Sequence, residues 1–470
     1  MPGILIATLL IASLLLVHFS MRAQPMSRRR PLDVDAGLPL PEAGQASTVF
    51  SLTALFGAYF GVYLVLGIPA LAGLAFGTAL GLVLIRRWIK AHHATTFEEF
   101  LISALSGPAS NVAVFGFTLA GIQCIYATSE LLILREIGKS ALGLRADHAT
   151  LMAIGLAVIG YFYILFGGYM ALFRTDVLQF ALVAAMALAL GIVLLRHGMP
   201  MGWAAKLMPR PGYWALLSEQ PGPLLYAYHF LIGVVMGLGF LAASPDAWKR
   251  VFILTKLRRD TRLRFLIFLT VGTAPFLVLV LLGIPTPPIP NGSVNAGRMF
   301  SAMLTSDLIF VAAALGLVAS FLSSFDSALL ASVQLGLILQ RQKAQVEFEG
   351  ARFHWLMVTV LITAFCLLTA LVSLQNPYLL ANLLLGAYSV VAGVEMGTAC
   401  VLARLPEHSF LWILLIGLVS WFLYVASTVG FPKVPNTDQI NTIPAGAFLC
   451  IVVALLSRLL VIGGRRYGHT

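Results

Sequence analysis

The sequence predicts an all-α polytopic membrane protein, because its composition and the length of its apolar runs exceed those of a soluble chain. Of its 470 residues, 59% are apolar and only 10% are charged, and the mean hydropathy is +0.93. Soluble domains average roughly 45–50% apolar and about 25% charged residues. The apolar runs are long and do not alternate, which disfavours a β-barrel. The lipid bilayer is therefore the expected partner of most of the surface.

Thirteen runs approach the roughly 20 apolar residues that a helix needs to cross a bilayer. They are residues 3–20, 48–66, 68–85, 108–133, 149–168, 175–195, 223–243, 264–285, 306–338, 355–374, 377–402, 409–428 and 444–463. The first run resembles a secretory signal in length. A signal peptide carries its positive charge before the apolar region, whereas the nearest Arg here follows it. We therefore expect a retained N-terminal helix.

The net charge of +11 is best explained by orientation in the membrane. With the N-terminus outside, 21 Lys and Arg residues fall in loops on the inner side and 8 in loops on the outer side. Inner loops of membrane proteins carry this excess. Nucleic-acid binding, the other interpretation of a basic chain, is disfavoured because the basic loops flank spans of bilayer length. We expect a multi-pass protein of the plasma or inner membrane with a cytoplasmic C-terminus.

The four cysteines are Cys124, Cys366, Cys400 and Cys450. They lie far apart in apolar runs, which fits neither a disulfide framework nor a CxxC metal site. We therefore interpret them as buried small apolar residues. The sequence contains no Walker motif and no His/Cys ligand cluster, so no organic cofactor is expected. An integral membrane enzyme would need a His/Asp/Glu cluster at a membrane face. None is found, so an enzyme is not expected.

Two segments, 48–66 and 223–243, are rich in glycine, and the second is followed by Ser244-Pro245. Discounting the first run, these segments are the first and sixth of ten core spans. Glycine-interrupted segments at matching positions of two halves are typical of transporters with inverted repeats. Close packing between helices is the alternative, since small residues let helices approach one another.

Oxygen-bearing side chains gather on one face of the run at 306–338. Its serines at spacing i, i+3, i+4 and i+7 are Ser320, Ser323, Ser324 and Ser327, and this spacing places four hydroxyls on one helical face. Asp326 borders that face. A small hard cation prefers several oxygen ligands, and a carboxylate in the bilayer costs at least ~2.5 kcal/mol without a partner. The alternative is that the serines bond to their own helix and Asp326 stays protonated.

Three further carboxylates lie in or beside apolar runs. Asp176 is at the inner end of run 175–195, where a water-facing pair with Arg174 is one interpretation and an ion route is the other. Glu130 and Glu395 are interpreted as structural groups, with contact to a solute as the alternative.

Several stretches are similar to motifs of the sodium/solute symporter family. Residues 167–179, GGYMALFRTDVLQ, resemble its signature of paired glycines, Thr-Asp and a following Gln. Residues 320–327, SFLSSFDS, resemble its serine-rich stretch on the eighth core helix. Residues 246–250 resemble an inner loop of the family, and residues 96–101 its entry to the third core helix. The resemblance extends over residues 48–405.

The resemblance implies a leucine-transporter-type core of two inverted five-helix repeats in residues 48–405. Residues 1–47 would form an N-terminal transmembrane helix and a basic inner loop, and residues 406–470 two C-terminal helices and a basic tail. It also implies a secondary active transporter: sodium-coupled symport of a small organic solute into the cell by alternating access, with a monomeric transport unit.

The resemblance further implies a sodium site between the first and eighth core helices. Its ligands would be the backbone carbonyl of Ser320, the hydroxyls of Ser323 and Ser324, and carbonyls of Ser51 and Ala54. A second cation or proton site would involve Asp176, Asp326 and Ser327. Candidate solute-facing residues are Gly57, Ala58, Tyr59, Gly237 and Phe240.

The departures from the family limit the substrate prediction. Trp248-Lys249 replaces a Gln before Arg250, and residues 57–61 lack the polar pair of sugar-binding members. A sugar is therefore disfavoured, and the solute itself is not predicted.

Two alternatives to sodium symport remain. One is proton coupling through Asp326 and Asp176. The other is a non-transporting membrane sensor with a symporter-like domain. The 470 residues contain no cytosolic signalling domain, which favours a transporter.

Overall fold

The computed structural model describes seven stretches of the chain and a few isolated positions. These are residues 68–92, 109–141, 143–197, 223–242, 244–256, 307–344 and 359–364, with 94, 97, 100, 264, 267, 366 and 367. The main elements are α4 (Ile68–Ala91), α6 (Ala109–Ala141), α7 (Ala146–His197), α9 (Pro223–Ala242), α10 (Pro245–Lys256) and α13 (Asp307–Ala344). All secondary structure within these residues is helical, as the sequence predicts.

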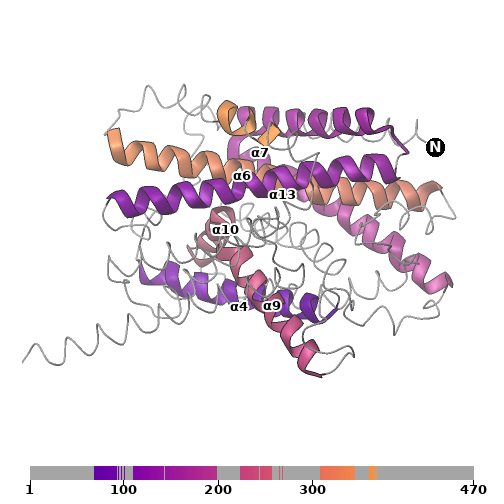
Figure 1. The fold of residues 1–470 in the computed structure, drawn as a ribbon, viewed down its shortest axis with the longest axis horizontal. Coiled ribbons are helices and arrows are strands. Elements are labelled where there is room, and N and C mark those ends of the chain that lie inside the picture. The colour runs from indigo at the N-terminus through magenta and orange to yellow at the C-terminus, as the bar shows by residue number, and fades with distance from the viewer. Residues whose placement is uncertain are drawn as a thin grey trace, which may run out of the picture.

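The described helices form two groups. Helices α4 and α9 pack together, and α6, α7 and α13 pack together. Figure 1 shows the first group below the second, with α10 between them. The short helix α10 contacts α4 and α9 on one side and α13 on the other. It therefore joins the two groups.

Small residues bring α4 and α9 into close contact. A Cβ on Gly73 would clash with the carbonyl of Phe230, and a Cβ on Gly233 would clash with the carbonyl of Ala70. Gly237 likewise faces the backbone of α4. Helix α9 runs without a break through these glycines. Of the two interpretations of segment 223–243, close packing is the one that the structure supports, because the missing side chains allow backbone-to-backbone approach.

The chain breaks immediately after α9, between Ala242 and Pro245. The Ser244 hydroxyl accepts a hydrogen bond from the Ala247 amide at 3.3 Å and so caps α10, as a serine at this position commonly does. Pro245 follows at the first helical position, where its missing N–H costs nothing. The indole of Trp248 donates to the carbonyl of Leu241 at 2.9 Å. One of the last carbonyls of α9 is therefore satisfied by the helix that follows.

Helix α10 replaces what the sequence suggested was an inner loop. Its Trp248 ring lies 5.1 Å from the ring of Trp88 on α4, in an edge-on arrangement. Trp88 also stacks edge-on against Phe100 at 5.1 Å, and Phe97 contacts Phe252 at 5.7 Å. Aromatic pairs of this geometry stabilise packing beyond the area that they bury. This cluster holds α10 against the end of α4.

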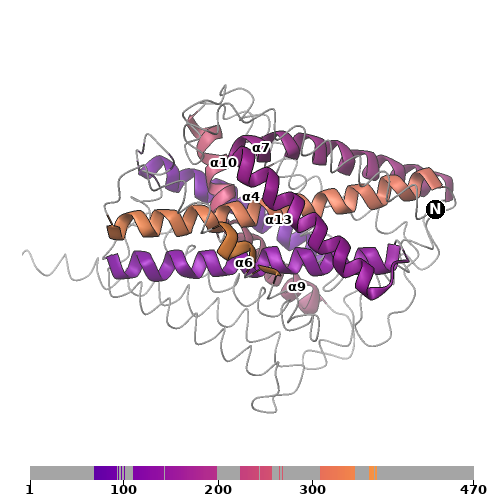
Figure 2. The same cartoon turned by 90° about the horizontal axis from the view of Figure 1, so that it is seen from above.

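Helix α7 differs from the prediction of two separate spans at 149–168 and 175–195. It is helical from Ala146 to His197, 52 residues, or about 78 Å at 1.5 Å per residue. A straight helix of that length would far exceed the ~30 Å hydrocarbon core. In Figure 2 its two halves diverge from the region of the α7 label. The paired Gly167-Gly168 lies within it, and such pairs favour kinks. Two predicted spans are thus joined by a helical bend instead of a loop.

Two described segments are long and apolar enough to cross a membrane, Ile68–Ala91 and Ala314–Val333. Shorter apolar helical segments lie at 146–162, 175–189 and 226–238. Large apolar side chains are exposed on α4, α7 and α9. They include Phe76, Leu151, Phe162, Leu188 and Leu231. Exposed apolar side chains on the outside of a helical assembly fit a lipid environment. The predicted spans at 3–20 and 48–66, and those beyond residue 374, lie outside the described residues.

Candidate functional site

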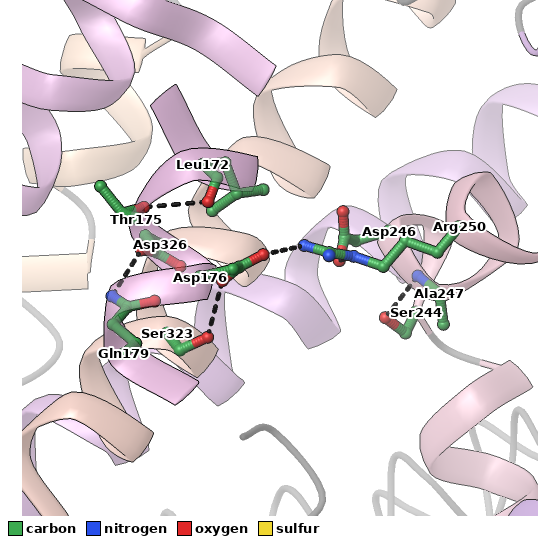
Figure 3. Close-up of polar contacts among 10 residues, drawn as sticks. All are labelled: Leu172, Thr175, Asp176, Gln179, Ser244, Asp246, Ala247, Arg250, Ser323 and Asp326. Carbon is green, nitrogen blue, oxygen red and sulfur yellow. Dashed lines mark hydrogen bonds and ion pairs between the residues drawn. The ribbon is translucent and has the colours of Figure 1, made fainter. Parts of the chain in front are cut away.

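Helices α7 and α13 face each other through two polar pairs. The Ser323 hydroxyl donates to Asp176 Oδ1 at 3.0 Å, and Gln179 Nε2 donates to Asp326 Oδ2 at 3.4 Å. Figure 3 shows both contacts. Residues 176 and 179, like residues 323 and 326, are three positions apart, which places each pair on one helical face. The Thr-Asp-x-x-Gln motif and the serine-rich motif therefore meet in register.

These groups are removed from solvent. Asp176, Ser323 and Asp326 have no exposed surface, and Ser327 is 4% exposed. Buried charges without partners are costly. The cluster therefore has to be balanced by internal partners, protons or ions.

A buried guanidinium supplies one such partner. Arg250 Nη2 lies 2.8 Å from Asp176 Oδ2, and its Nε lies 2.7 Å from Asp246 Oδ2, four residues earlier on α10. Figure 3 shows Arg250 reaching from α10 toward α7. The Arg250 side chain is only 2% exposed. A single cation thus serves two carboxylates on two helices.

Electrostatics keep Arg250 charged. It lies on α10, between the predicted spans 223–243 and 264–285. Burial alone would lower the pKa of its guanidinium, but Asp246 and Asp176 together raise that pKa above its ordinary value. When both are ionised, the two carboxylates carry one more charge than the guanidinium that they share. Asp246 Oδ1 is buried and has no hydrogen-bond partner among the described residues.

The serine hydroxyls do not all behave alike. Ser324 donates to the carbonyl of Ser320 at 3.2 Å, which is the self-bonding alternative, whereas Ser323 reaches across to α7. A donating hydroxyl still has lone pairs that can accept or coordinate. Ser320 and Ser324 are both buried, so the expected sodium ligands on α13 face the protein interior.

The remaining predicted site residues are distributed as follows. Ser51, Ala54, Gly57, Ala58 and Tyr59 lie outside the described residues. Gly237 lies in the α4–α9 crossing. Phe240 is within α9, but its side chain is outside the described part. Among the described residues, no three His, Cys, Asp or Glu side chains come together as a metal site.

Sequence reasoning missed the partner of Asp176. The water-facing pair with Arg174 is wrong, because Asp176 is fully buried and pairs with Arg250. Asp246 and Arg250 stand at i and i+4, a spacing that signals a helical ion pair. No local pattern, however, links Arg250 to a residue 74 positions earlier. Glu130 is buried on α6, as its structural interpretation requires.

The two described cysteines, Cys124 and Cys366, are buried and free, as the sequence predicts, but their proximity was not expected. Cys124 and Cys366, which are far apart in the sequence, lie against each other. The Cys366 thiol donates to the carbonyl of Cys124 at 3.7 Å. Both remain free thiols. Cys400 and Cys450 lie outside the described residues.

No protein-family model matches the chain, and no curated protein sequence matches it. Solved structures are similar in fold. A Na⁺-coupled sialic acid symporter in a substrate-bound outward-open state matches 97% of this chain and 97% of its own, with a TM-score of 0.65 and 16% identity. A mutant manganese transporter from Eremococcus coleocola matches 93% of this chain and 99% of its own, with a TM-score of 0.51 and 12% identity.

The chain therefore has the fold of multi-pass membrane transporters. At these identities the likeness concerns the fold and does not establish membership of the sodium/solute symporter family. Both of these solved structures are transporters.

Proposed function

We propose that this protein is a secondary active transporter that couples sodium entry to the uptake of a small organic solute. The observation that carries the proposal is the alignment of Asp176 and Gln179 on α7 with Ser323 and Asp326 on α13. It gathers buried oxygens on facing helices, which is the ligand chemistry of a small hard cation. Similarity in fold to a Na⁺-coupled symporter supports the same choice of ion.

Sodium would use the carbonyl of Ser320 and the hydroxyls of Ser323 and Ser324, completed by carbonyls of Ser51 and Ala54. Asp176, Asp326 and Ser327 would form a second cation or proton position beside it. The hydroxyl of Ser323, a ligand at the first position, also contacts Asp176 at the second. An ion would therefore pass from the first position toward Asp176 along Ser323. Because Arg250 pairs with Asp176, it would reduce the negative charge that an ion encounters at the second position.

Coupling would follow from bridging. A cation held by α13 and by the first core helix stabilises the arrangement in which both ligand sets are within bonding distance. If that arrangement also binds the solute better, each ligand raises the affinity of the other by the same factor. Moving one positive charge inward gains ~2.3 kcal/mol per 100 mV, which would drive accumulation of the solute.

The sodium site is tested by stability in sodium against potassium. A cation at about 100 times its Kd stabilises the folded protein by about 2.7 kcal/mol. Ser323→Ala combined with Ser324→Ala should abolish the sodium-dependent rise in Tm of the purified full chain. Ser332→Ala is the matched control, since Ser332 is a buried serine of the same helix whose hydroxyl donates to Ala328 at 2.9 Å. The control should keep its sodium response, and a full sodium response in the double variant would refute the assignment.

Proton coupling is the second candidate, because Asp326 is a fully buried carboxyl group whose charge a proton would neutralise. Asp326→Asn distinguishes the two ions in proteoliposomes. A retained sodium-driven current with no pH dependence supports a proton role for Asp326. Loss of the sodium response supports a role in cation binding.

A further inference from the structure

Two thiols from distant parts of the chain meet in a buried position away from the cation site. Cys124 is on α6, and Cys366 follows the helical residues 359–364, 242 positions after Cys124. The Cys366 Sγ lies 3.7 Å from the Cys124 carbonyl oxygen, so the two cysteine residues are in direct contact. Neither is in a disulfide.

The surrounding hydroxyls fix both cysteines. The Cys124 thiol donates to Ser332 Oγ on α13 at 3.7 Å. Thr128 lies one turn further along α6, and its hydroxyl is 2.8 Å from the Cys124 carbonyl and 3.4 Å from the Cys366 carbonyl. Three parts of the chain therefore converge on the pair, so the contact is held by more than one element.

Exposure distinguishes the roles of the two sulfurs. Cys124 is 6% exposed, whereas Cys366 has no exposed surface. A small oxidant would therefore reach Cys124 first. Cys366 is then placed as the resolving thiol, since a second cysteine beside the first is a common feature of reversible thiol sites.

We propose that Cys124 and Cys366 are a dithiol pair that a small neutral peroxide oxidises to a disulfide. The Cys124 sulfur attacks one oxygen of hydrogen peroxide, the O–O bond breaks, and water leaves with the thiol proton. The Cys366 sulfur then attacks the sulfenic sulfur of Cys124. An S–S bond forms, the S–O bond breaks, and a second water leaves. Two thiols and one peroxide thus give one disulfide and two waters.

Closure would tie α6 covalently to Cys366, beside α13, the helix that carries the candidate cation site. It would also release Ser332 from the Cys124 thiol. The inference rests on the cysteine contacts alone and does not depend on sodium coupling.

The test uses the full chain with Cys400→Ala and Cys450→Ala, so that only the two thiols of interest remain. After hydrogen peroxide treatment in detergent, the protein is denatured, reacted with a maleimide and weighed intact. We expect monomeric chain that has lost two hydrogen masses, takes up no maleimide, and recovers two reactive thiols with dithiothreitol. The oxidised form should also melt at a higher temperature than the reduced form, because the cross-link constrains the unfolded chain.

The matched controls are Cys124→Ala and Cys366→Ala in the same background. Each should leave one thiol, which gains oxygen or stays reactive but never shows the loss of two hydrogens. Three results would overturn the proposal: two maleimide-reactive thiols after oxidation, independent gain of oxygen on both sulfurs, or a disulfide between two chains.

Discussion

The guanidinium of Arg250 serves two buried carboxylates, so its removal should be the most damaging single change in the polar network. The ion pairs are 2.8 Å to Asp176 and 2.7 Å to Asp246. At an effective dielectric constant of about 20, each attraction amounts to roughly 6 kcal/mol before desolvation is subtracted. Desolvation offsets most of this when both partners are present. When one partner is removed, the other stays buried and its desolvation cost is no longer offset by the attraction.

The magnitude follows from what each variant leaves behind. Arg250→Met leaves two carboxylates without their cation, and breaking a buried pair costs about 3–5 kcal/mol. Asp246→Asn leaves the Arg250–Asp176 pair intact, so its cost should be smaller. Adding Asp176→Asn and Asp246→Asn to Arg250→Met removes both orphaned charges. This triple variant should regain a large part of the lost stability.

The assay is thermal unfolding of the full chain in one detergent at one scan rate, because membrane proteins commonly unfold irreversibly and Tm then depends on rate. Lys256→Met is the matched control. Lys256 is an exposed cation of the same helix, and its ammonium lies 5.4 Å from the Phe252 ring centre. An Arg250→Met variant no less stable than Asp246→Asn, or a triple variant with no recovery, would refute the charge argument.

Two further predictions concern the helix crossing and the helix break. Gly233→Ala should destabilise the protein by about 1–3 kcal/mol, as overpacking does. Gly155→Ala is the control, because a Cβ there meets nothing within 4 Å, and it should be neutral or stabilising by up to about 1 kcal/mol. Equal Tm values for the two variants would contradict the packing argument. Ser244→Ala should cost about 1 kcal/mol by removing the cap of α10, and Ser244→Asp should restore most of it, so a Tm unaffected by either change would show that the cap is not needed.

Apolar run length predicted the helices well where the chain is described. The runs at 68–85, 108–133 and 306–338 correspond to α4, α6 and α13, each of which continues further at its C-terminal end. The extra turns carry charged residues such as Arg86 and Lys90. Hydropathy ends a span at the first charge, but the backbone hydrogen bonds of a helix continue past it. Helix α10 was missed because its residues are mixed in polarity and its burial depends on tertiary contacts.

The sequence predicts which polar residues of the site share a helix, but not which residues of different helices contact each other. Spacing grouped the serines of α13, whereas Asp176 and Gln179 were placed together only by the resemblance of residues 167–179 to a family signature. The pairing of the two faces joins residues 147 positions apart, and such a contact leaves no local periodic trace. The Arg250–Asp176 pair was hidden for the same reason. The cysteine interpretation was incomplete because distance along the chain was taken for distance in space.

The polar network would also link binding of the proposed cation at Asp176 to the packing of α10. Asp176 divides its oxygens between Ser323 and Arg250, and Arg250 keeps a second carboxylate, Asp246, on its own helix. A cation at Asp176 would compete with Arg250 for that carboxylate. The guanidinium would remain balanced, because it keeps its ion pair with Asp246. The exchange would loosen α10 from α7 while keeping every charge paired. Since α10 joins the two helix groups, occupancy at Asp176 would bear directly on how firmly the groups are held together.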